Sequence, residues 1–409
     1  MSASEHFDVA VVGASIGGCT AARLYAQAGA RVALVERRPE MDAHKTVCTH
    51  FIQPSATPTI ERLGLAGPIE EHGGQRNSID LWTPHSGWIR HRRDTLHGYN
   101  VTRRVLDPLL RRMTADTPGV ELMTGWTATE LVMNGRPSGV VAEDVRHTRR
   151  ELRARLVVAA DGRDTRLARM ANVPGRVRPH NRFFYWAYWR GLETDGGHSR
   201  FWFMEPDCAY TFPNEDGLCL VLAAPHRDRL PEFRADLEGA YLRYVAALPD
   251  GPDLGAATRE SKILGKLDVP NVSRPAARPG IAFVGDAAMA SDPLWGVGCG
   301  WAFQSAEWLV DETTDALLGG SDADLDAALE SYRRVHRRRL APHHFVISDL
   351  ASGRRANPIE KAMYRAAVDD DDVFHAFERI GARWESPATL FAPRTMMRLA
   401  LSRAGARTA

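Results

Sequence analysis

A glycine-rich turn and a distant acidic residue are the first parts of this chain whose types and spacing could do chemistry. The turn reads Gly13-Ala14-Ser15-Ile16-Gly17-Gly18 after one apolar run, and Glu36 ends a second apolar run. Backbone N–H groups at such a turn bind phosphate, and an acid after the next strand accepts hydrogen bonds from ribose hydroxyls. Because that acid disfavours a 2′-phosphate, the pattern predicts a site for FAD or NAD rather than NADP.

Three residues of the turn have distinct expected roles. Gly13 supplies the tight turn, and Gly18 lets the following helix pack closely on the strand. Ser15 stands where the usual fingerprint has its middle glycine, and its hydroxyl can donate a hydrogen bond to a phosphate oxygen. The turn alone is moderately specific, so other motifs must identify the dinucleotide.

Two further motifs each follow an apolar run that predicts a buried strand. The first is Asp161-Gly162, after residues 152–160, and the second is Gly285-Asp286, after residues 279–284. The carboxylate of Asp286 is an acceptor suited to a sugar-alcohol hydroxyl. Each dipeptide alone is ordinary turn chemistry, but their order, each closing a strand, is much less common.

A second glycine-rich segment comes next and precedes an expected helix. It reads Pro293-Leu294-Trp295-Gly296-Val297-Gly298-Cys299-Gly300. Gly296, Gly298 and Gly300 allow the main chain to lie against a flat ring. The positive end of the helix that follows would favour negative charge on such a ring.

The composition is that of an ordinary globular protein. The chain has 409 residues, 44% hydrophobic and 25% charged, with a formal net charge of +1. The near-neutral charge gives no field for nucleic acid, and no apolar run is long enough for stable membrane insertion. The five cysteines are scattered without metal-ligand spacing. We therefore expect no metal and, with no secretory signal visible, a cytoplasmic protein.

Apolar periodicity predicts the elements that must hold the first motifs. Residues 7–12 and 31–36 read as buried strands on either side of a helix over 15–29. Shorter helices are expected over 54–64 and 103–117. The order strand, turn, helix and strand places the glycine-rich turn at a helix start.

Alternation of apolar and polar residues appears first over 78–91 and becomes the main pattern after about residue 172. Residues 78–91 predict a hairpin, and residues 181–224 alternate apolar and polar with many aromatics, which predicts an antiparallel sheet with a packed or ligand-facing side. A helix over 231–247 and a strand over 258–268 follow. Helices are expected from 299 onward, with breaks at Pro342, Pro358, Pro387 and Pro393, and with His336-Arg337-Arg338-Arg339 as a solvated face.

With its motifs in this order, the chain resembles the FAD-dependent aromatic hydroxylase superfamily, typified by para-hydroxybenzoate hydroxylase. It is also similar to the related geranylgeranyl reductases and flavin halogenases. The resemblance covers about residues 1–320 and includes Arg103 with Asp107, which match the family's Arg-x-x-Leu/Phe-Asp pattern. The chain departs from the family pattern at two positions. Ser15 replaces a glycine, and Met289 stands where hydroxylases usually carry histidine. The methionine loosens the analogy to the hydroxylase branch.

The resemblance implies an α/β fold in which a GR2-type Rossmann-like FAD domain is interrupted by an antiparallel β-sheet substrate domain and followed by C-terminal helices. The FAD domain is expected to consist of three separate segments, 1–76, 96–172 and 273–320. A substrate-side hairpin (77–95) and the substrate domain (173–272) lie between these segments, and a C-terminal helical region (321–409) follows the last of them.

The resemblance also implies the residues of the site. Those expected to bind FAD are Gly13, Ser15, Gly18, Glu36, Arg37, Arg103, Asp161, Gly285, Asp286, Pro293, Gly296, Gly298 and Gly300. The candidates for substrate contact are Trp186, Tyr188, Phe201, Phe203, Tyr210 and Phe212, which are equally suited to core packing. The flavin carries the hard chemistry, so few acid–base groups are expected, and the candidates near the ring are His50, Trp295 and Cys299.

The resemblance favours a monooxygenase that inserts one oxygen atom from O2, by way of a flavin C4a-hydroperoxide, into an electron-rich small molecule, aromatic or polyketide-like. No second Gly-rich nucleotide turn is visible, so NAD(P)H is expected to dock transiently or a partner flavin reductase to supply reduced flavin. The expected assembly is a monomer or a dimer.

Three alternatives stay open. Asp-Pro-Leu-x-Gly-x-Gly suggests a reductase of a prenyl-like double bond. A halogenase is disfavoured because its W-x-W-x-I-P motif is absent, and the nearest stretch is Trp186-Ala187-Tyr188-Trp189-Arg190. The third alternative is a flavin-bound protein without turnover.

Two further segments carry weaker signals of a function. Cys48 and His50 lie in a loop expected near the flavin, and Lys45 invites comparison with the catalytic lysine of halogenases. The basic end, Met396-Met397-Arg398-Leu399, is expected to dock on the protein or fray rather than to bind a membrane.

Overall fold

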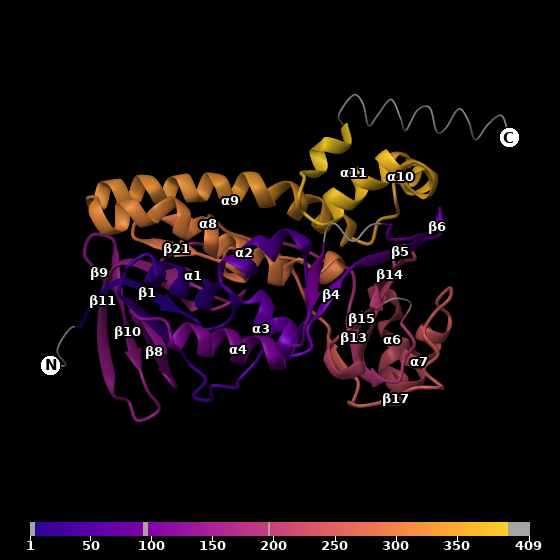
Figure 1. The fold of residues 1–409 in the computed structure, drawn as a ribbon, viewed down its shortest axis with the longest axis horizontal. Coiled ribbons are helices and arrows are strands. Elements are labelled where there is room, and N and C mark those ends of the chain that lie inside the picture. Colours follow the sequence, from indigo (N-terminus) through magenta and orange to yellow (C-terminus); the bar gives the residue numbers. More distant parts are fainter. Residues whose placement is uncertain (1–4, 93–96, 195–196, 392–409) are drawn as a thin grey trace.

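Two large β-sheets lie at opposite ends of the long axis of the molecule, and helices cover them (Figure 1). The computed structural model describes residues 5–92, 97–194 and 197–391, so Pro393 and the basic end of the chain lie outside the described residues. The fold is the expected mixed α/β architecture with two sheets and C-terminal helices.

The first sheet has a parallel centre in the order β21-β11-β1-β2-β8. Strands β9 and β10 extend the edge beside the first half of β11 as an antiparallel meander, and β20 pairs with β21. The bounds are β1 Glu5–Val12, β2 Val32–Glu36, β8 Val120–Thr124, β9 Thr127–Met133, β10 Pro137–Glu143, β11 Arg149–Ala159, β20 Ala277–Arg278 and β21 Ile281–Phe283.

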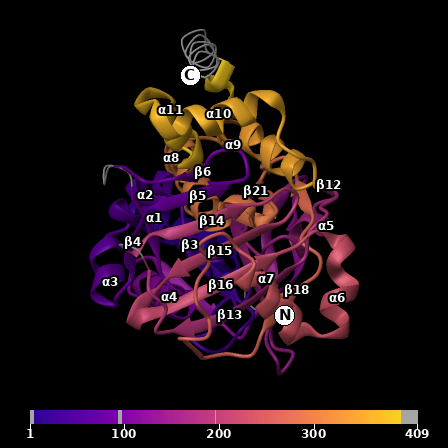
Figure 2. The ribbon, with the colours of Figure 1, turned by 90° about the vertical axis from the view of Figure 1, so that its right-hand side faces the viewer.

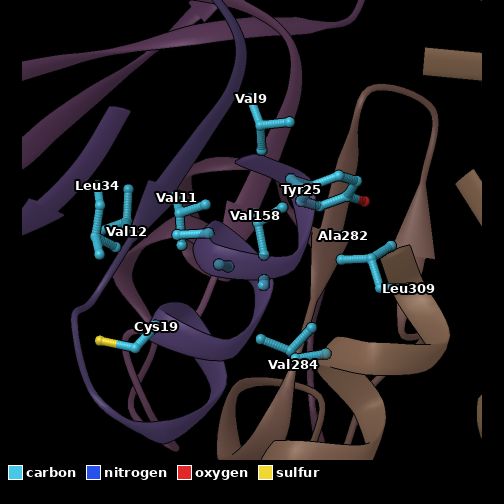
Figure 3. Packing of buried hydrophobic residues seen from close by; sticks show 14 of the residues in the cluster. Val9, Val11, Val12, Cys19, Tyr25, Leu34, Val158, Ala282, Val284 and Leu309 are labelled. Atoms are coloured by element: carbon cyan, nitrogen blue, oxygen red, sulfur yellow. The ribbon is translucent and has the colours of Figure 1, made fainter. Parts of the chain in front are cut away.

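The central strands of this sheet are buried on both faces, and for that reason they are apolar throughout rather than alternating. Helices α1 (Ile16–Gln27) and α8 (Gly298–Gly319) pack directly against each other. Figure 3 shows Val11 and Val158 from the strands between residues of α1 and Leu309 of α8. The Tyr25 hydroxyl also hydrogen-bonds Thr313 at 2.5 Å, which ties the two helices together.

The second sheet runs β17-β13-β16-β15-β14-β5-β6, with β18 also on β13. The hairpin β5–β6 belongs to it because β5 pairs in parallel with β14. The bounds are β5 Ile79–Thr83, β6 Gly87–Ile89, β13 Phe184–Arg190, β14 Ser199–Phe203, β15 Cys208–Pro213, β16 Leu218–Ala224, β17 Thr258–Arg259 and β18 Leu264–Lys266.

Alternation along these strands separates two faces. Phe184 and Trp186 of β13 point into a cluster with the segment 293–301, whereas Ala187 and Trp189 pack under helices α6 and α7. The helices span Leu230–Ala235 and Leu237–Ala246, so the single helix expected over 231–247 was wrong. Asp236 divides them, because its carboxylate accepts a hydrogen bond from the backbone N–H of Gly239 and caps α7. The strand expected over 258–268 is likewise two short strands, β17 and β18.

The remaining elements connect the two sheets or cover them. Helices are α2 Thr57–Arg62, α3 Ala66–Glu71, α4 Arg103–Ala115, α5 Arg166–Met170, α9 Asp322–Leu350, α10 Pro358–Asp369 and α11 Asp371–Gly381. Short strands are β3 Phe51–Ile52, β4 Gln75–Asn77, β7 Gly98–Asn100, β12 Arg176–Arg178, β19 Asn271–Ser273 and β22 Met289–Ala290. The short 3-10 helices are Pro54–Ala56, Glu215–Gly217, Arg227–Arg229, Gly285–Ala287, Pro293–Trp295 and Pro387–Phe391. Helices α10 and α11 lie beyond the edge of the second sheet where β5 and β6 run (Figure 2).

Helix α9 departs from the sequence prediction in two ways. It continues through Pro342, although proline removes one helical hydrogen bond. Buried residues on both sides of the proline, Leu340 and Ile347 among them, anchor the helix across the gap. His336 is buried rather than solvated, and only the three arginines that follow it face outward.

Burial of His336 makes the stability of the protein depend on pH. Burial, with the nearby charge of His344, lowers the pKa of His336 to about 4 from an ordinary value of 6.5. The unfolded chain therefore takes up a proton below pH 6.5 that the folded chain refuses, so stability present above pH 6.5 is lost as the pH falls toward 4. We expect His336→Phe to reduce this loss by up to about 1.4 kcal/mol per pH unit, measured by urea unfolding at pH 7, 6 and 5.

The surface variant His72→Phe is the control and should keep the wild-type dependence, since His72 is exposed. An unchanged slope in His336→Phe would contradict the buried, neutral histidine.

In the parts of the chain that the structure describes, the helices are all too short or too polar to cross a membrane. The five cysteines are free thiols, and among the described residues no group of three or more potential ligands could hold a metal ion.

Candidate functional site

The glycine-rich turn lies between β1 and α1 with no room for side chains. Gly13 has φ +105°, and a Cβ there would lie 2.5 Å from the carbonyl oxygen of Ala160. A Cβ on Gly18 would lie 1.8 Å from the carbonyl oxygen of Gly13. The turn is therefore pressed against the end of β11 and against the first turn of α1, which leaves its backbone open on the remaining side.

Glu36 ends β2 beside this turn. Its carboxylate accepts hydrogen bonds from the backbone N–H of Ala14 at 2.8 Å and of Arg38 at 3.0 Å. Burial opposes ionisation, but these N–H groups and the Arg38 guanidinium outweigh it and lower the pKa of Glu36. Glu36 is thus a fixed, ionised acceptor, and Arg38 rather than the exposed Arg37 is its partner.

Arg103, at the start of α4, connects several of the candidate residues. Its guanidinium donates to the hydroxyl of Ser15 at 2.6 Å and forms a buried ion pair with Asp107 at 2.6 Å. Burial opposes the charged form, but Asp107 and the neighbouring sulfur atoms of Cys48 and Cys299 raise the pKa of Arg103. The arginine therefore stays protonated and ties the first motif to the glycine-rich segment near 299.

Asp161 closes β11 next to Gly13. Its Oδ2 caps α5 by accepting from the backbone N–H of Arg166 at 2.7 Å, while Oδ1 is buried and has no partner among the described residues. An unpartnered buried acceptor beside the dinucleotide turn can receive a hydroxyl or amino group of a bound nucleotide.

Asp286 and Lys45 form the next component of the site. The Lys45 ammonium lies 3.0 Å from Oδ2 of Asp286, and the Asp286 carboxylate raises the pKa of Lys45 despite the opposing effect of burial. A Cβ on the exposed Gly298 would meet only Oδ1 of Asp286, at 3.9 Å. The main chain at the start of α8 is therefore open on the side where Asp286 and Lys45 lie.

Hydrogen bonds, an ion pair and close packing hold the loop before α8 in place. Asp292 accepts from the backbone N–H of Leu294 at 2.9 Å and pairs with the buried Arg182. Gly296 has φ +61°, and a Cβ there would meet the ring of Phe51 at 2.8 Å. The Gln53 amide donates to the carbonyl oxygen of Trp295. Pro293 begins the short 3-10 helix, and Gly300 packs against the side chain of Gln53.

Cys48 and Cys299 face each other at the edge of this loop. Their Sγ atoms are 3.6 Å apart, and the backbone N–H of His50 donates to the sulfur of Cys48. The hydrogen bond with Cys299 lowers the pKa of Cys48 well below its ordinary value, helped by the charge of Arg103. The same contact raises the pKa of Cys299, which is buried. The contact therefore favours the thiolate form on Cys48 over Cys299.

We expect iodoacetamide to alkylate Cys48 before the other four cysteines of the native protein. Cys48 is half-buried, while the other four are buried, and burial raises the pKa of Cys208 to about 11. Peptide mass spectrometry after short exposure measures the order. Cys48→Ser should remove the fast-labelled peptide, and early labelling of any buried cysteine would contradict the assignment.

His50 links the two halves of the site. It has φ +63°, a strained conformation for a residue with a side chain. The backbone N–H of Arg103 donates to its Nδ1 at 3.0 Å, and its Nε2 lies 2.5 Å from the hydroxyl of Tyr188 on β13. Because Nδ1 accepts, neutral His50 carries its proton on Nε2 and donates it to the Tyr188 oxygen. The phenolic proton of Tyr188 is then available to another acceptor.

The six aromatic candidates share one face of the second sheet, the face toward Trp295. Five of them are packed into a closed core in which no side chain is more than 7% exposed: Trp186, Phe201, Phe203, Tyr210 and Phe212. The rings of Phe203 and Trp295 meet edge to face at 4.8 Å, and Tyr210 donates to the carbonyl oxygen of Leu294 at 2.9 Å. Tyr188 alone of the six is partly exposed.

These residues fit an FAD molecule. The turn excludes a Cβ at Gly13 and at Gly18, Asp161 has an unpartnered acceptor, and the backbone at Gly298 is open. Gly285, whose N–H donates to Ser305, begins the turn that presents Asp286. Glu36 and Asp286 would hold the two sugar portions, while the turn would hold the pyrophosphate.

Several residues of the site carry no local sequence signal. Gln53, Arg38 and Arg111 are examples, and Arg111 donates to the carbonyl oxygens of Ala14 and Met41 from inside α4. Only the predicted helix over 103–117 could have indicated Arg111, since it lies two turns after Arg103 on that helix.

Comparisons with known proteins identify the family. A family model described as FAD dependent oxidoreductase matches residues 8–182. The chain is 30% identical to a 6-methylpretetramide 4-monooxygenase from Streptomyces rimosus, over 74% of this chain and 73% of the relative. It is 24% identical to a digeranylgeranylglycerophospholipid reductase from Thermoplasma acidophilum, over 83% and 85%. It is 28% identical to a tryptophan 2-halogenase from Chondromyces crocatus, over 80% of this chain but 64% of that relative.

Solved structures show the same fold. The flavin-dependent brominase Bmp2 superposes with a TM-score of 0.81 at 15% identity, over 98% of this chain and 100% of that chain. A geranylgeranyl bacteriochlorophyll reductase-like protein from Thermoplasma acidophilum gives a TM-score of 0.71 at 18% identity, over 98% and 100%. With the matches in sequence, these findings show that the chain belongs to the FAD-dependent oxidoreductases that include halogenases, monooxygenases and geranylgeranyl reductases.

Proposed function

We propose that this FAD-dependent oxidoreductase is a monooxygenase acting on a small aromatic or polyketide-like molecule that carries a hydroxyl group. When bound, reduced FAD would supply the activation of O2, and the protein's own residues bind and orient the substrate and exclude water. NAD(P)H, docking transiently, or a partner flavin reductase would supply the electrons.

The observation that carries this proposal is the His50–Tyr188 pair, which lies at the one partly exposed ring among the six aromatic candidates. His50 donates to the Tyr188 oxygen, so the phenolic proton of Tyr188 can bind a substrate hydroxyl or phenolate oxygen. Holding a phenol in its more anionic form makes the ring richer in electrons and more reactive toward an electrophilic oxygen. The identity to the monooxygenase from Streptomyces rimosus supports the same reading.

A prenyl reductase is the second candidate, and the archaeal reductases among the relatives favour it. A prenyl chain needs a long apolar channel, whereas the five buried rings on this sheet fill the space against one another. A halogenase is less well supported, because Lys45 is paired with Asp286 among the candidate cofactor residues rather than with the aromatic face.

Isotope labelling separates these three reactions. The holoprotein would be supplied with NADH or NADPH, ¹⁸O2 and a panel of phenols and polyketide-like aromatics. Parallel samples would contain a prenyl lipid under nitrogen, or bromide with the aromatic panel. We expect a product that contains one ¹⁸O atom. Equal turnover of the lipid under nitrogen, or a brominated product, would replace the proposal with the corresponding alternative.

Tyr188→Phe should lower kcat/KM for a phenolic substrate by about 100-fold, because it removes the proton that binds and polarises the substrate oxygen. FAD content should not change, since Tyr188 contacts the cofactor residues only through His50. Tyr185→Phe is the matched control, because Tyr185 lies on the opposite face and stacks on Phe233. Similar kinetics for the two variants would remove Tyr188 from the site.

A further inference from the structure

Arg383, just after α11, brings a buried guanidinium next to Trp295. The guanidinium carbon lies 5.1 Å from the centre of the Trp295 ring. Its Nη1 donates to the carbonyl oxygen of Ile380 at 2.8 Å and to Nδ1 of His343 at 3.4 Å. Its Nε and Nη2 are buried and have no hydrogen-bond partner among the described residues. One whole edge of the guanidinium is thus left without an acceptor.

The unpartnered Nε–Nη2 edge of Arg383 is suited to bind an anion. Burial lowers the pKa of Arg383 to about 9, so the group is still charged at neutral pH. Burial and the charge of Arg383 lower the pKa of His343 to about 3, so this histidine is neutral and can only accept from Nη1. Nε–H and Nη2–H point the same way, and they form the fork that binds both oxygens of a carboxylate.

The acids nearest in sequence do not pair with Arg383 in the described part of the chain. Glu378 lies 3.3 Å from Nδ1 of His91, and Glu385 pairs with Arg379 at 2.5 Å. A charged group buried without a counter-ion is unfavourable unless a ligand supplies the missing acceptor. The Nε–Nη2 edge of Arg383 is therefore a buried donor edge without an acceptor among the described residues, which an anionic ligand would satisfy.

The surroundings place this edge at the substrate side of the site. Trp295 belongs to the loop before α8, and its ring packs on Phe203 of the aromatic face. The backbone N–H of Ser55 donates to the carbonyl oxygen of Ala382, the residue before Arg383, at 3.3 Å. The Oγ of Ser55 is also buried without a partner among the described residues. The end of α11 is thus tied to the short helix Pro54–Ala56, and Arg383 after it lies against Trp295 of the loop. Figure 1 shows α10 and α11 on the side of the molecule where β5 and β6 run.

We propose that the Nε–Nη2 edge of Arg383 binds the carboxylate of an aromatic or otherwise apolar substrate beside Trp295. That the carboxylic acid is the substrate rests on the proposed function, whereas the binding itself does not. The segment after α11 would then contribute the cationic anchor for the carboxylate, and Trp295 would contribute the apolar contact.

Binding measured without turnover tests this proposal. The oxidised holoprotein would be titrated with benzoate, 2-naphthoate, cinnamate and octanoate, with the four matching carboxamides, and with sodium chloride, by calorimetry and thermal shift. We expect the carboxylates that bind to do so roughly 10- to 100-fold more tightly than their amides. Arg383→Met should bring this ratio to about one and should not lower the midpoint of the unliganded protein, because it removes an unpaired buried charge.

Arg379→Met is the matched control, since Arg379 is exposed on α11, four residues before Arg383, and has Glu385 as its partner. Arg383→Lys keeps the charge without the fork, and it should lose most of the preference even if the methionine variant folds poorly. The proposal is overturned if no carboxylate outbinds its amide, if Arg383→Met keeps the preference, or if chloride competes as well as the carboxylates. The titration needs neither reductant nor O2, so its result does not depend on the reaction that the protein catalyses. If the carboxylates bind more tightly than their amides but the labelling experiment gives no ¹⁸O product, the monooxygenase proposal is refuted and the carboxylate site is not.

Discussion

Replacing Gly18 by alanine is expected to abolish FAD binding and to destabilise the protein by about 3 kcal/mol or more. The new Cβ would lie 1.8 Å from the carbonyl oxygen of Gly13, which cannot retreat because the N–H of Gly13 is hydrogen-bonded to Val35 at 2.7 Å. Helix α1 would have to move away from β1, and the phosphate-binding turn would open. Flavin absorbance per protein and urea unfolding measure the two effects.

Gly67→Ala is the matched control for this variant. Gly67 also lies in a helix, and a Cβ there would have nothing within 4 Å. Alanine should leave the FAD content unchanged and stabilise the helix by roughly 0.5–1 kcal/mol. A Gly18→Ala protein that retains one FAD per chain would show that the turn is looser than described.

Arg103→Met should cost about 3–5 kcal/mol of stability and most of the affinity for FAD. The change leaves the Asp107 carboxylate, whose side chain is fully buried, without its counter-ion. It also removes the donor to Ser15, and with it the link between the phosphate turn and the segment around Cys299. Denaturant unfolding of the apoprotein and titration with FAD measure the two losses separately.

The neighbouring residue provides the comparison for this prediction. Arg104 is exposed, so Arg104→Ala should change stability by less than about 0.5 kcal/mol. Arg103→Lys retains the charge but loses the fork that reaches both Asp107 and Ser15, and it should fold better than the methionine variant while still binding FAD weakly. Equal FAD affinity in Arg103→Met and wild type would remove Arg103 from the cofactor site.

The sequence was sufficient to predict those elements of the fold that depend on the pattern of residues within a short stretch of chain. The apolar runs of the parallel sheet, the alternation from 181 to 224 and the glycine-rich turn are local patterns, and the structure places strands and a helix start at each. The aromatic candidates on β13, β14 and β15 share a face for the same reason, because a strand alternates its side chains with a period of two.

Contacts between distant segments could not be read from local patterns. Cys48 and Cys299 lie 251 residues apart in the chain, and Arg383 reaches His343 across 40 residues. Nothing in the spacing of such residues indicates a partner, because packing of separate elements sets the distance. Pro342 shows the reverse case, in which tertiary burial maintains a helix that the local rule would end.

The reaction of the reduced flavoprotein with O2 tests the central claim most directly. The holoprotein would be reduced under nitrogen and mixed rapidly with oxygenated buffer, and the flavin absorbance would be followed with and without an aromatic carboxylate that binds. A monooxygenase should reoxidise in two resolved phases, with a spectrum between them that matches neither reduced nor oxidised FAD. Reoxidation in one phase at the rate of free reduced FAD, in every condition, would contradict the proposed oxygen transfer.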